Sequence, residues 1–312
     1  MAEKSALRRN ASKYRRTMIR RNWELYLMFL PVLIYFVVYH YVPMYGIQIA
    51  FRKFSGAKGI WGSPWRGTYY FERFFKSAFF GQIVGNTLLL SLYSLLAGFP
   101  APIILALLLN EVRSPVYKKT VQTITYAPHF ISTVVMCSMI ILFLSPTSGF
   151  INKFIELFGG QAVYFMGNPK YFRAIYVISG IWQNTGWSAI IYSAALTSID
   201  PEQHEAAIID GANRLQRIWY INIPGILPTA VILLIMSCGS IMSVGFEKAF
   251  LLANDLNISK AEIISTYVYK RGLLDHDYSM STAIGLFNSV INLALLLTVN
   301  TISRRIGETS LW

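Results

Sequence analysis

The chain has 312 residues, of which 54% are hydrophobic and only 14% are charged, with 28 basic residues against 15 acidic ones. Soluble domains usually carry about 25% charged residues, and their helices place charges on an outer face. This composition excludes an ordinary soluble protein and predicts an integral membrane protein.

Six long stretches of the chain contain no Asp, Glu, Lys or Arg: 25–51, 77–110, 120–152, 174–199, 218–246 and 278–303. A helix needs roughly 20 residues to cross the ~30 Å hydrocarbon core of a bilayer. We therefore predict an all-α integral membrane protein with a transmembrane domain at 24–303. Its six spans are expected at about 25–48, 84–110, 121–144, 173–197, 224–246 and 279–303.

The N-terminal tail, residues 1–23, is strongly basic and contains a single acid before residue 24, Glu3. The apolar run that follows is longer than the core of a signal peptide and lacks a small-residue cleavage site, which indicates an uncleaved anchor. Basic residues favour the cytoplasmic side, so the tail is expected there. Six crossings then return the C-terminal tail, 304–312, to the cytoplasm. Nucleic-acid binding would also fit a basic tail, but orientation is the expected role in a membrane protein, and no nucleic-acid partner is predicted.

Short sequence features predict local structure within and between the spans. The sequence "YYFERFF" at 69–75 predicts a short surface helix after the first span, and Pro100 and Pro102 interrupt the second span. Pro128 is expected to kink the third span. The cysteines and histidines show no metal-ligand spacing, so no metal site is predicted.

The segment 200–212 is polar and lies between the fourth and fifth spans. Asp200 is suited to cap a helix, Pro201 fits its first position, and Gly211 can take a positive φ and end it with a bend. A second helical piece follows and meets Pro224. The small side chains of Ala206 and Ala207 let another protein approach the helix closely. The acids beside them can contact basic groups of such a partner. An amphipathic connector on the bilayer surface is the alternative, although such connectors are usually rich in lysine.

These residues carry a resemblance to a known family. The segment resembles the EAA motif of permease subunits of binding-protein-dependent ABC importers, through Glu205-Ala206-Ala207, then Gly211, then Pro224. Asp210 beside Gly211 resembles the sugar-importer version, while Ile223 stands where the family has leucine. The stretches "APHFIS", "TYVYKRGL" and "AIGLFNSVIN" are similar to the subgroup that imports complex oligosaccharides.

The resemblance implies a type I ABC importer permease of the bacterial cell membrane, with the EAA segment as a coupling helix. The coupling residues would be Glu205, Ala206, Ala207, Asp210, Gly211 and Pro224. The expected partners are a second, related permease, two ATPase subunits and an extracytoplasmic solute-binding protein. No phosphate-loop motif occurs in the sequence, so ATP and Mg²⁺ are expected on the ATPases and no enzyme activity on this chain.

Two other membrane functions are the alternatives. A secondary sugar transporter would show acids within its spans, and a membrane enzyme acting on lipid-linked sugars would show clustered acids at a membrane face. Neither pattern occurs. For an importer, the predicted substrate-pathway residues, which combine aromatic faces with amide groups, are Trp182, Asn184, Trp187, Asn288 and Asn292. Lipid-interface packing is the alternative for the tryptophans, and an interhelical hydrogen bond for Asn288 and Asn292.

The predicted outer segments, 52–76, 153–173 and 247–277, hold 13 basic and seven acidic residues. A positive mouth would concentrate an anionic solute. Anchoring of the loops at lipid headgroups, or docking of an acidic binding protein, would explain the same charges. The hypothesis is an oligosaccharide substrate that contains uronate, of the kind derived from pectin or alginate.

Overall fold

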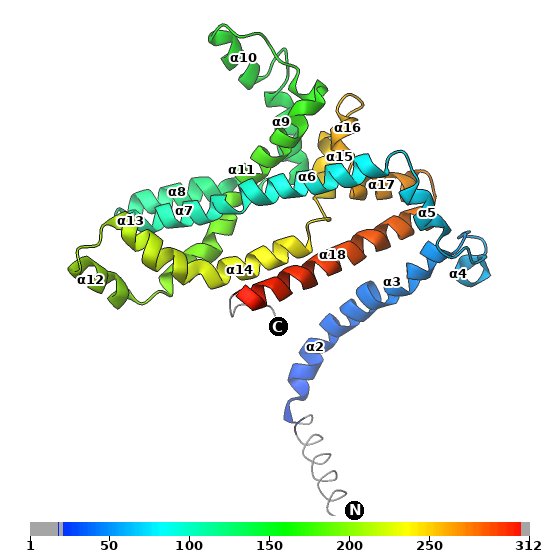
Figure 1. Ribbon diagram of the computed structural model, residues 1–312, viewed down its shortest axis with the longest axis horizontal. Helices are drawn as coiled ribbons and strands as arrows, with labels where there is room; N and C mark the ends of the chain where they lie inside the picture. The colour runs from blue at the N-terminus through cyan, green and yellow to red at the C-terminus, as the bar shows by residue number, and fades with distance from the viewer. Residues whose placement is uncertain (1–17, 19–20, 307–312) are drawn as a thin grey trace, which may run out of the picture. The chain divides into compact units, whose positions relative to one another are not determined.

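The structure is a computed structural model that describes residue 18 and residues 21–306 (Figure 1). Within these residues it contains helices and no β-strand. The chain divides into two compact units, residues 1–68 and 69–312, and each is described by itself. Most of the basic tail at 1–23 and of the C-terminal tail at 304–312 lies outside the described residues.

The first unit holds one long apolar helix and a short loop. The helix runs from Trp23 to Phe51 over 29 residues and comprises α2 (Trp23–Phe36), η1 (Val37–Tyr41), α3 (Val42–Met44) and η2 (Tyr45–Phe51). None of the residues of α2 is buried, as expected for a helix that faces lipid. After it comes α4 (Gly59–Gly62), where the Arg52 guanidinium lies 5.8 Å and 5.6 Å from the ring centroids of Trp61 and Trp65.

The second unit begins with the short helix predicted from "YYFERFF", which is α5 (Tyr69–Phe75). This helix is not only a surface helix, because Tyr70 and Phe74 are buried and Phe74 packs against the Phe287 ring at 5.8 Å. Next come α6 (Phe80–Gly98) and α7 (Pro100–Glu111), which together form one apolar helix of 32 residues. The predicted interruption is slight, because Pro100 takes the first position of α7, where a proline is tolerated.

The predicted kink in the third span is a sharp break. Helix α8 (Pro115–Tyr126) continues into η3 (Ala127–Phe130), and α9 (Thr133–Phe143) then leaves at 100°. Pro128 lies in η3, and the Ser132 side chain accepts a hydrogen bond from the Val135 N–H to start α9. The backbone therefore ends one helix and caps a new one, instead of bending a single helix.

The remaining helices follow in chain order. They are α10 (Phe150–Leu157), η4 (Phe165–Gly167), α11 (Pro169–Thr197), α12 (Pro201–Ile209), α13 (Arg214–Arg217), η5 (Ile218–Asn222), α14 (Ile223–Gly239), α15 (Phe246–Leu252), α16 (Ile258–Ala261), α17 (Ile264–Tyr269), η6 (Lys270–Leu274) and α18 (Tyr278–Ile306). Figure 1 shows α12 at one end of the second unit, apart from its long helices.

Four described helices are long and apolar enough to cross a membrane, and the bent pair of α8–η3 and α9 would make a fifth. These four are Trp23–Phe51, Phe80–Glu111, Arg214–Gly239 and Tyr278–Arg305. Helix α11 occupies the predicted fourth span and has 29 residues, but it is not among them. Polar residues such as Gln183 and Asn184 interrupt its apolar sequence. Six spans therefore stay a prediction.

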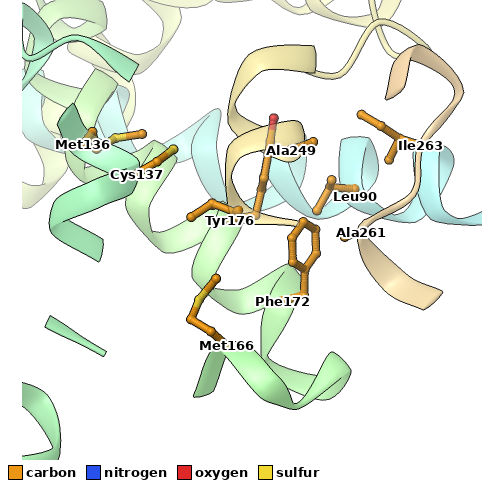
Figure 2. Close-up of a cluster of buried hydrophobic side chains, with 10 residues drawn as sticks. Leu90, Met136, Cys137, Met166, Phe172, Tyr176, Ala249, Ala261 and Ile263 are labelled. Carbon is orange, nitrogen blue, oxygen red and sulfur yellow. The ribbon is translucent and has the colours of Figure 1, made fainter. Parts of the chain in front are cut away.

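Helix α11 organises the interior of the second unit. One buried cluster joins α6, α9, α11 and α15 through Leu90, Met136, Phe172, Tyr176 and Ala249. In Figure 2 the central group is Leu90, Phe172, Tyr176 and Ala249, and Met136 lies to one side next to Cys137. A second cluster joins α11 to α7 and α14. Gly186 lets α8 approach α11 closely, because a Cβ at this position would collide with the Thr125 carbonyl oxygen.

Candidate functional site: a polar cavity and an exposed coupling segment

A cavity of about 860 Å³ lies among α6, α9, α11, α14 and α15 in the second unit. This volume is in the upper part of the range of pockets that hold small ligands, about 300–1,000 Å³. Its wall mixes apolar side chains with hydroxyl, amide and imidazole groups, which suits a ligand with many hydroxyls. The polar residues that line it include Ser91, His129, Ser132, Gln183, Asn184 and Ser237.

Helix α11 supplies the middle of this wall. The Asn184 amide donates to the Gly180 carbonyl at 3.1 Å, and its oxygen lies 3.3 Å from Nδ1 of His129. The His129 ring stacks on Trp187, with ring centroids 4.7 Å apart and an angle of 3° between the planes. These contacts fix a flat aromatic pair with an amide at the edge of the cavity.

Helix α15 adds one acid and one base to the wall, next to α11. Glu247 and Lys248 both line the cavity from α15; the Glu247 side chain is exposed, whereas Lys248 is only 8% exposed. The Lys248 ammonium donates to the Tyr176 carbonyl at 2.6 Å and lies 4.5 Å from the centroid of the Tyr176 ring. In the sequence, Lys248 is one of the charges of the third outer segment, because it comes two positions after the end of the fifth charge-free run.

The second feature is the exposed segment around α12. The Asp200 side chain caps the helix by accepting from the Glu202 N–H at 3.0 Å, and Pro201 occupies its first turn. At its end, Gly211 has φ 81°, its N–H bonds the Ile208 carbonyl, and the Ala212 N–H bonds the Ala207 carbonyl. This is a Schellman ending, which requires a left-handed residue at Gly211. The predicted helix, cap and bend are therefore confirmed as local structure.

Helix α12 has the accessibility of a docking surface. It contains no buried residue, and Ile208 and Ile209 are 56% and 85% exposed. Within the described residues no ion pair involves Glu202, Glu205 or Asp210. After the bend, α13 begins with a capping box between Asn213 and Gln216. The chain then passes through the π-helical turn η5 into α14, where Pro224 lies in the first turn.

The five predicted pathway residues do not share one surface. Asn184 lines the cavity, and Trp187 touches it through His129; Trp182 is 48% exposed and is not part of the lining. Asn292 ties α18 to the loop after α14, because its side chain accepts from the Met242 N–H at 2.9 Å and donates to Ser243 at 2.8 Å. Asn288 is also outside the lining, and its buried side-chain oxygen has no hydrogen-bond partner in the described residues.

Comparison with known proteins identifies the family. Residues 98–308 match the model of the binding-protein-dependent transport system inner membrane component. The chain belongs to this family. It is 44% identical to Protein LplB of Bacillus subtilis, over 94% of this chain and 92% of the relative. It is also 44% identical to the polygalacturonan/rhamnogalacturonan transport system permease protein YteP of the same species, over 92% of this chain and 90% of YteP.

Solved structures agree with this assignment over nearly the whole chain. One is a bacterial ABC transporter involved in the import of the acidic polysaccharide alginate, at 44% identity and a TM-score of 0.87, covering 93% of this chain and 98% of that one. A second is the alginate transporter in complex with its periplasmic protein bound to an alginate pentasaccharide, at 43% identity and a TM-score of 0.88 over 95% of this chain and 99% of that one.

Family membership settles the class of protein. The chain is a multi-pass membrane permease of an ABC importer with the type I fold. A permease of this family works with a second permease, with ATPase subunits that hydrolyse ATP, and with a solute-binding protein. The two alternatives, a secondary transporter and a membrane enzyme acting on lipid-linked sugars, are thereby set aside.

Proposed function

We propose that this chain is one permease subunit of an importer for acidic oligosaccharides, paired with a related but different permease. The main support is its 44% identity and TM-score of 0.87 to a permease chain of an alginate importer. The relative named for polygalacturonan and rhamnogalacturonan transport points to the same substrate class, because those polymers contain uronic acids.

The cavity is proposed as this subunit's half of the translocation pathway. Amides and hydroxyls on its wall can exchange hydrogen bonds with sugar hydroxyls, and the His129–Trp187 pair offers an aromatic edge. Trp182, Asn184, Trp187, Asn288 and Asn292 remain the proposed substrate-contacting set, with Asn184 best supported by its position in the lining.

Segment 200–212 is proposed as the coupling helix, which docks on an ATPase at the cytoplasmic face. This role is supported by the exposure of the helix, by its acids, which form no ion pair within the described residues, and by its hydrogen-bonded ending at Gly211. ATP and Mg²⁺ bind on the ATPases, whose closure would push α12 and rearrange the spans as near-rigid rods. We also propose that both termini lie in the cytoplasm, because the N-terminal tail is basic.

The test of the substrate class uses the cognate binding protein and the reconstituted importer. We expect the binding protein to bind short oligogalacturonates or alginate oligomers by calorimetry, and the loaded protein to stimulate ATP hydrolysis by the importer. Maltotriose serves as the neutral control. Tight binding of neutral glucans, without affinity for either uronate oligomer, would contradict the acidic substrate while leaving the family assignment intact.

A further inference from the structure

The wall of the cavity contains a buried ammonium group. Lys248 on α15 is 8% exposed, yet it borders the cavity. Its Nζ donates to the Tyr176 carbonyl at 2.6 Å and lies over the Tyr176 ring at 4.5 Å. The Tyr176 hydroxyl in turn lies 3.3 Å from the Gly245 carbonyl, to which it donates a hydrogen bond, so the ring is held in place. The lysine is therefore positioned by the fold.

This charge has no anionic partner within the described residues. The ion pairs found there join Arg73 to Asp277, Lys270 to Glu262 and Arg271 to Asp275. Glu247, the neighbouring acid on α15, is exposed and forms no ion pair with Lys248. An ammonium has three donors, and the structure satisfies one of them at the Tyr176 carbonyl. Burying a charge without a counter-charge costs free energy, so an anion that enters the cavity would find an unsatisfied cation.

Gly180 makes room for this ammonium on α11. A Cβ at position 180 would lie 3.2 Å from Nζ of Lys248, closer than ordinary van der Waals contact. Asn184, one turn further along α11, donates to the Gly180 carbonyl and also lines the cavity. The cation and a sugar-compatible amide thus lie on the same stretch of cavity wall.

We propose that Lys248 binds a carboxylate of the oligosaccharide in the cavity and thereby selects acidic over neutral sugars. This inference rests on the proposed function and adds a specificity-determining residue to it. A hydrogen bond between two charged groups is stronger than one between neutral groups, so loss of the cation should be felt by acidic substrates alone.

The test compares two probes with the same sugar backbone: trigalacturonate, whose carboxyl groups are charged, and its fully methyl-esterified form, which is neutral. Uptake of each is measured in proteoliposomes with the complete importer, at a probe concentration that saturates the binding protein. Lys248→Met should lower uptake of trigalacturonate about tenfold or more, while uptake of the ester changes less than about twofold. Lys248→Arg, which keeps the charge, should retain most of the trigalacturonate uptake.

Lys260→Met is the matched control, because it removes the same charge from an exposed position on α16. It should leave uptake of both probes within about twofold of the wild type. Parallel losses for both probes in a fully assembled Lys248→Met importer would overturn the inference and leave Lys248 a packing role, as would undiminished trigalacturonate uptake. A wild-type importer that takes up neutral oligosaccharides and no uronate oligomer would instead overturn the proposed function.

Discussion

At the scale of single residues, the burial of Lys248 decides the pH at which the cavity wall loses a positive charge. Burial lowers the pKa of Lys248 to about 8, and α15 lies outside the segments proposed to span the membrane. The titratable groups around it are Glu247 on the same helix, Cys137 on α9 and Tyr176 on α11. A lysine is charged below its pKa, so the cation is present at neutral pH and is lost as the pH rises through about 8.

This gives a pH prediction. Relative to Lys248→Arg, the wild-type importer should lose uptake of an acidic oligosaccharide between pH 7 and 9, because arginine stays charged throughout this range. The ratio of the two uptake rates, measured in proteoliposomes at each pH, cancels the pH dependence of the ATPases and the binding protein. A ratio that stays constant across the range would show that deprotonation of Lys248 does not limit transport.

Asn292 carries a second prediction at this scale. Its hydrogen bonds to the Met242 N–H and the Ser243 hydroxyl join α18 to the loop after α14. Asn292→Ala should therefore lower the stability of the assembled permease by about 1 kcal/mol, seen as a reduced melting temperature. Altered selectivity at unchanged stability would favour direct contact with substrate instead. Asn292→Ser, which keeps a shorter hydrogen-bonding group, is the milder comparison.

At the scale of elements, α12 combines a hydrogen-bonded ending with an exposed surface. The Schellman ending fixes the direction in which the chain leaves toward α13, and Gly211 permits it through φ 81°. Nothing in the described part of the second unit covers the Ile209 side chain, which is 85% exposed. The hydrogen bonds of this ending hold the direction in which the chain leaves α12, so a displacement of the exposed helix can pass along the chain toward α13 and α14.

Substitutions at α12 test this coupling role. Gly211→Val should reduce substrate-stimulated ATP hydrolysis several-fold, because a β-branched residue is strained by about 1–2 kcal/mol at positive φ. Gly211→Asn is the control, since asparagine tolerates this conformation and should retain most of the stimulation. Glu205→Lys, which reverses a charge at the docking surface, should likewise uncouple the assembled complex. Full stimulation in a stable Glu205→Lys complex would count against α12 as the coupling helix.

At the scale of the whole molecule, orientation in the membrane decides what each face can do. The proposed arrangement places α12 on the cytoplasmic side and α16 on the opposite side. The outer segments carry more basic than acidic residues, which would draw an acidic solute toward the cavity.

Cysteine labelling tests this orientation. In a variant with Cys137 and Cys238 replaced by serine, Gln203→Cys should react with a membrane-impermeant maleimide only in inside-out vesicles. Lys260→Cys should react only in right-side-out vesicles. Both side chains are exposed in the structure, so accessibility within the protein does not limit the reaction. The reverse pattern would invert the proposed topology.

The sequence determined the class of this protein and the local structure of its coupling segment. Runs without charge predict membrane helices because lipid excludes charged side chains. Such a run is a property of consecutive residues, so it can be read from the sequence alone. Asp200, Pro201 and Gly211 predicted a cap, a first turn and a bend for the same reason: each acts on backbone groups within a few positions of itself.

Only the tertiary structure decided which side chains share the cavity. Lys248 follows a charge-free run and looks like any loop lysine, but α15 folds back against α9 and α11 and buries it beside Tyr176. Asn184 and Asn292 are both asparagines within predicted spans. Asn184 lines the cavity, whereas Asn292 joins α18 to the loop after α14. Helical periodicity gives the face on which a residue lies, whereas the packing of distant helices decides whether that face meets protein, lipid or a cavity.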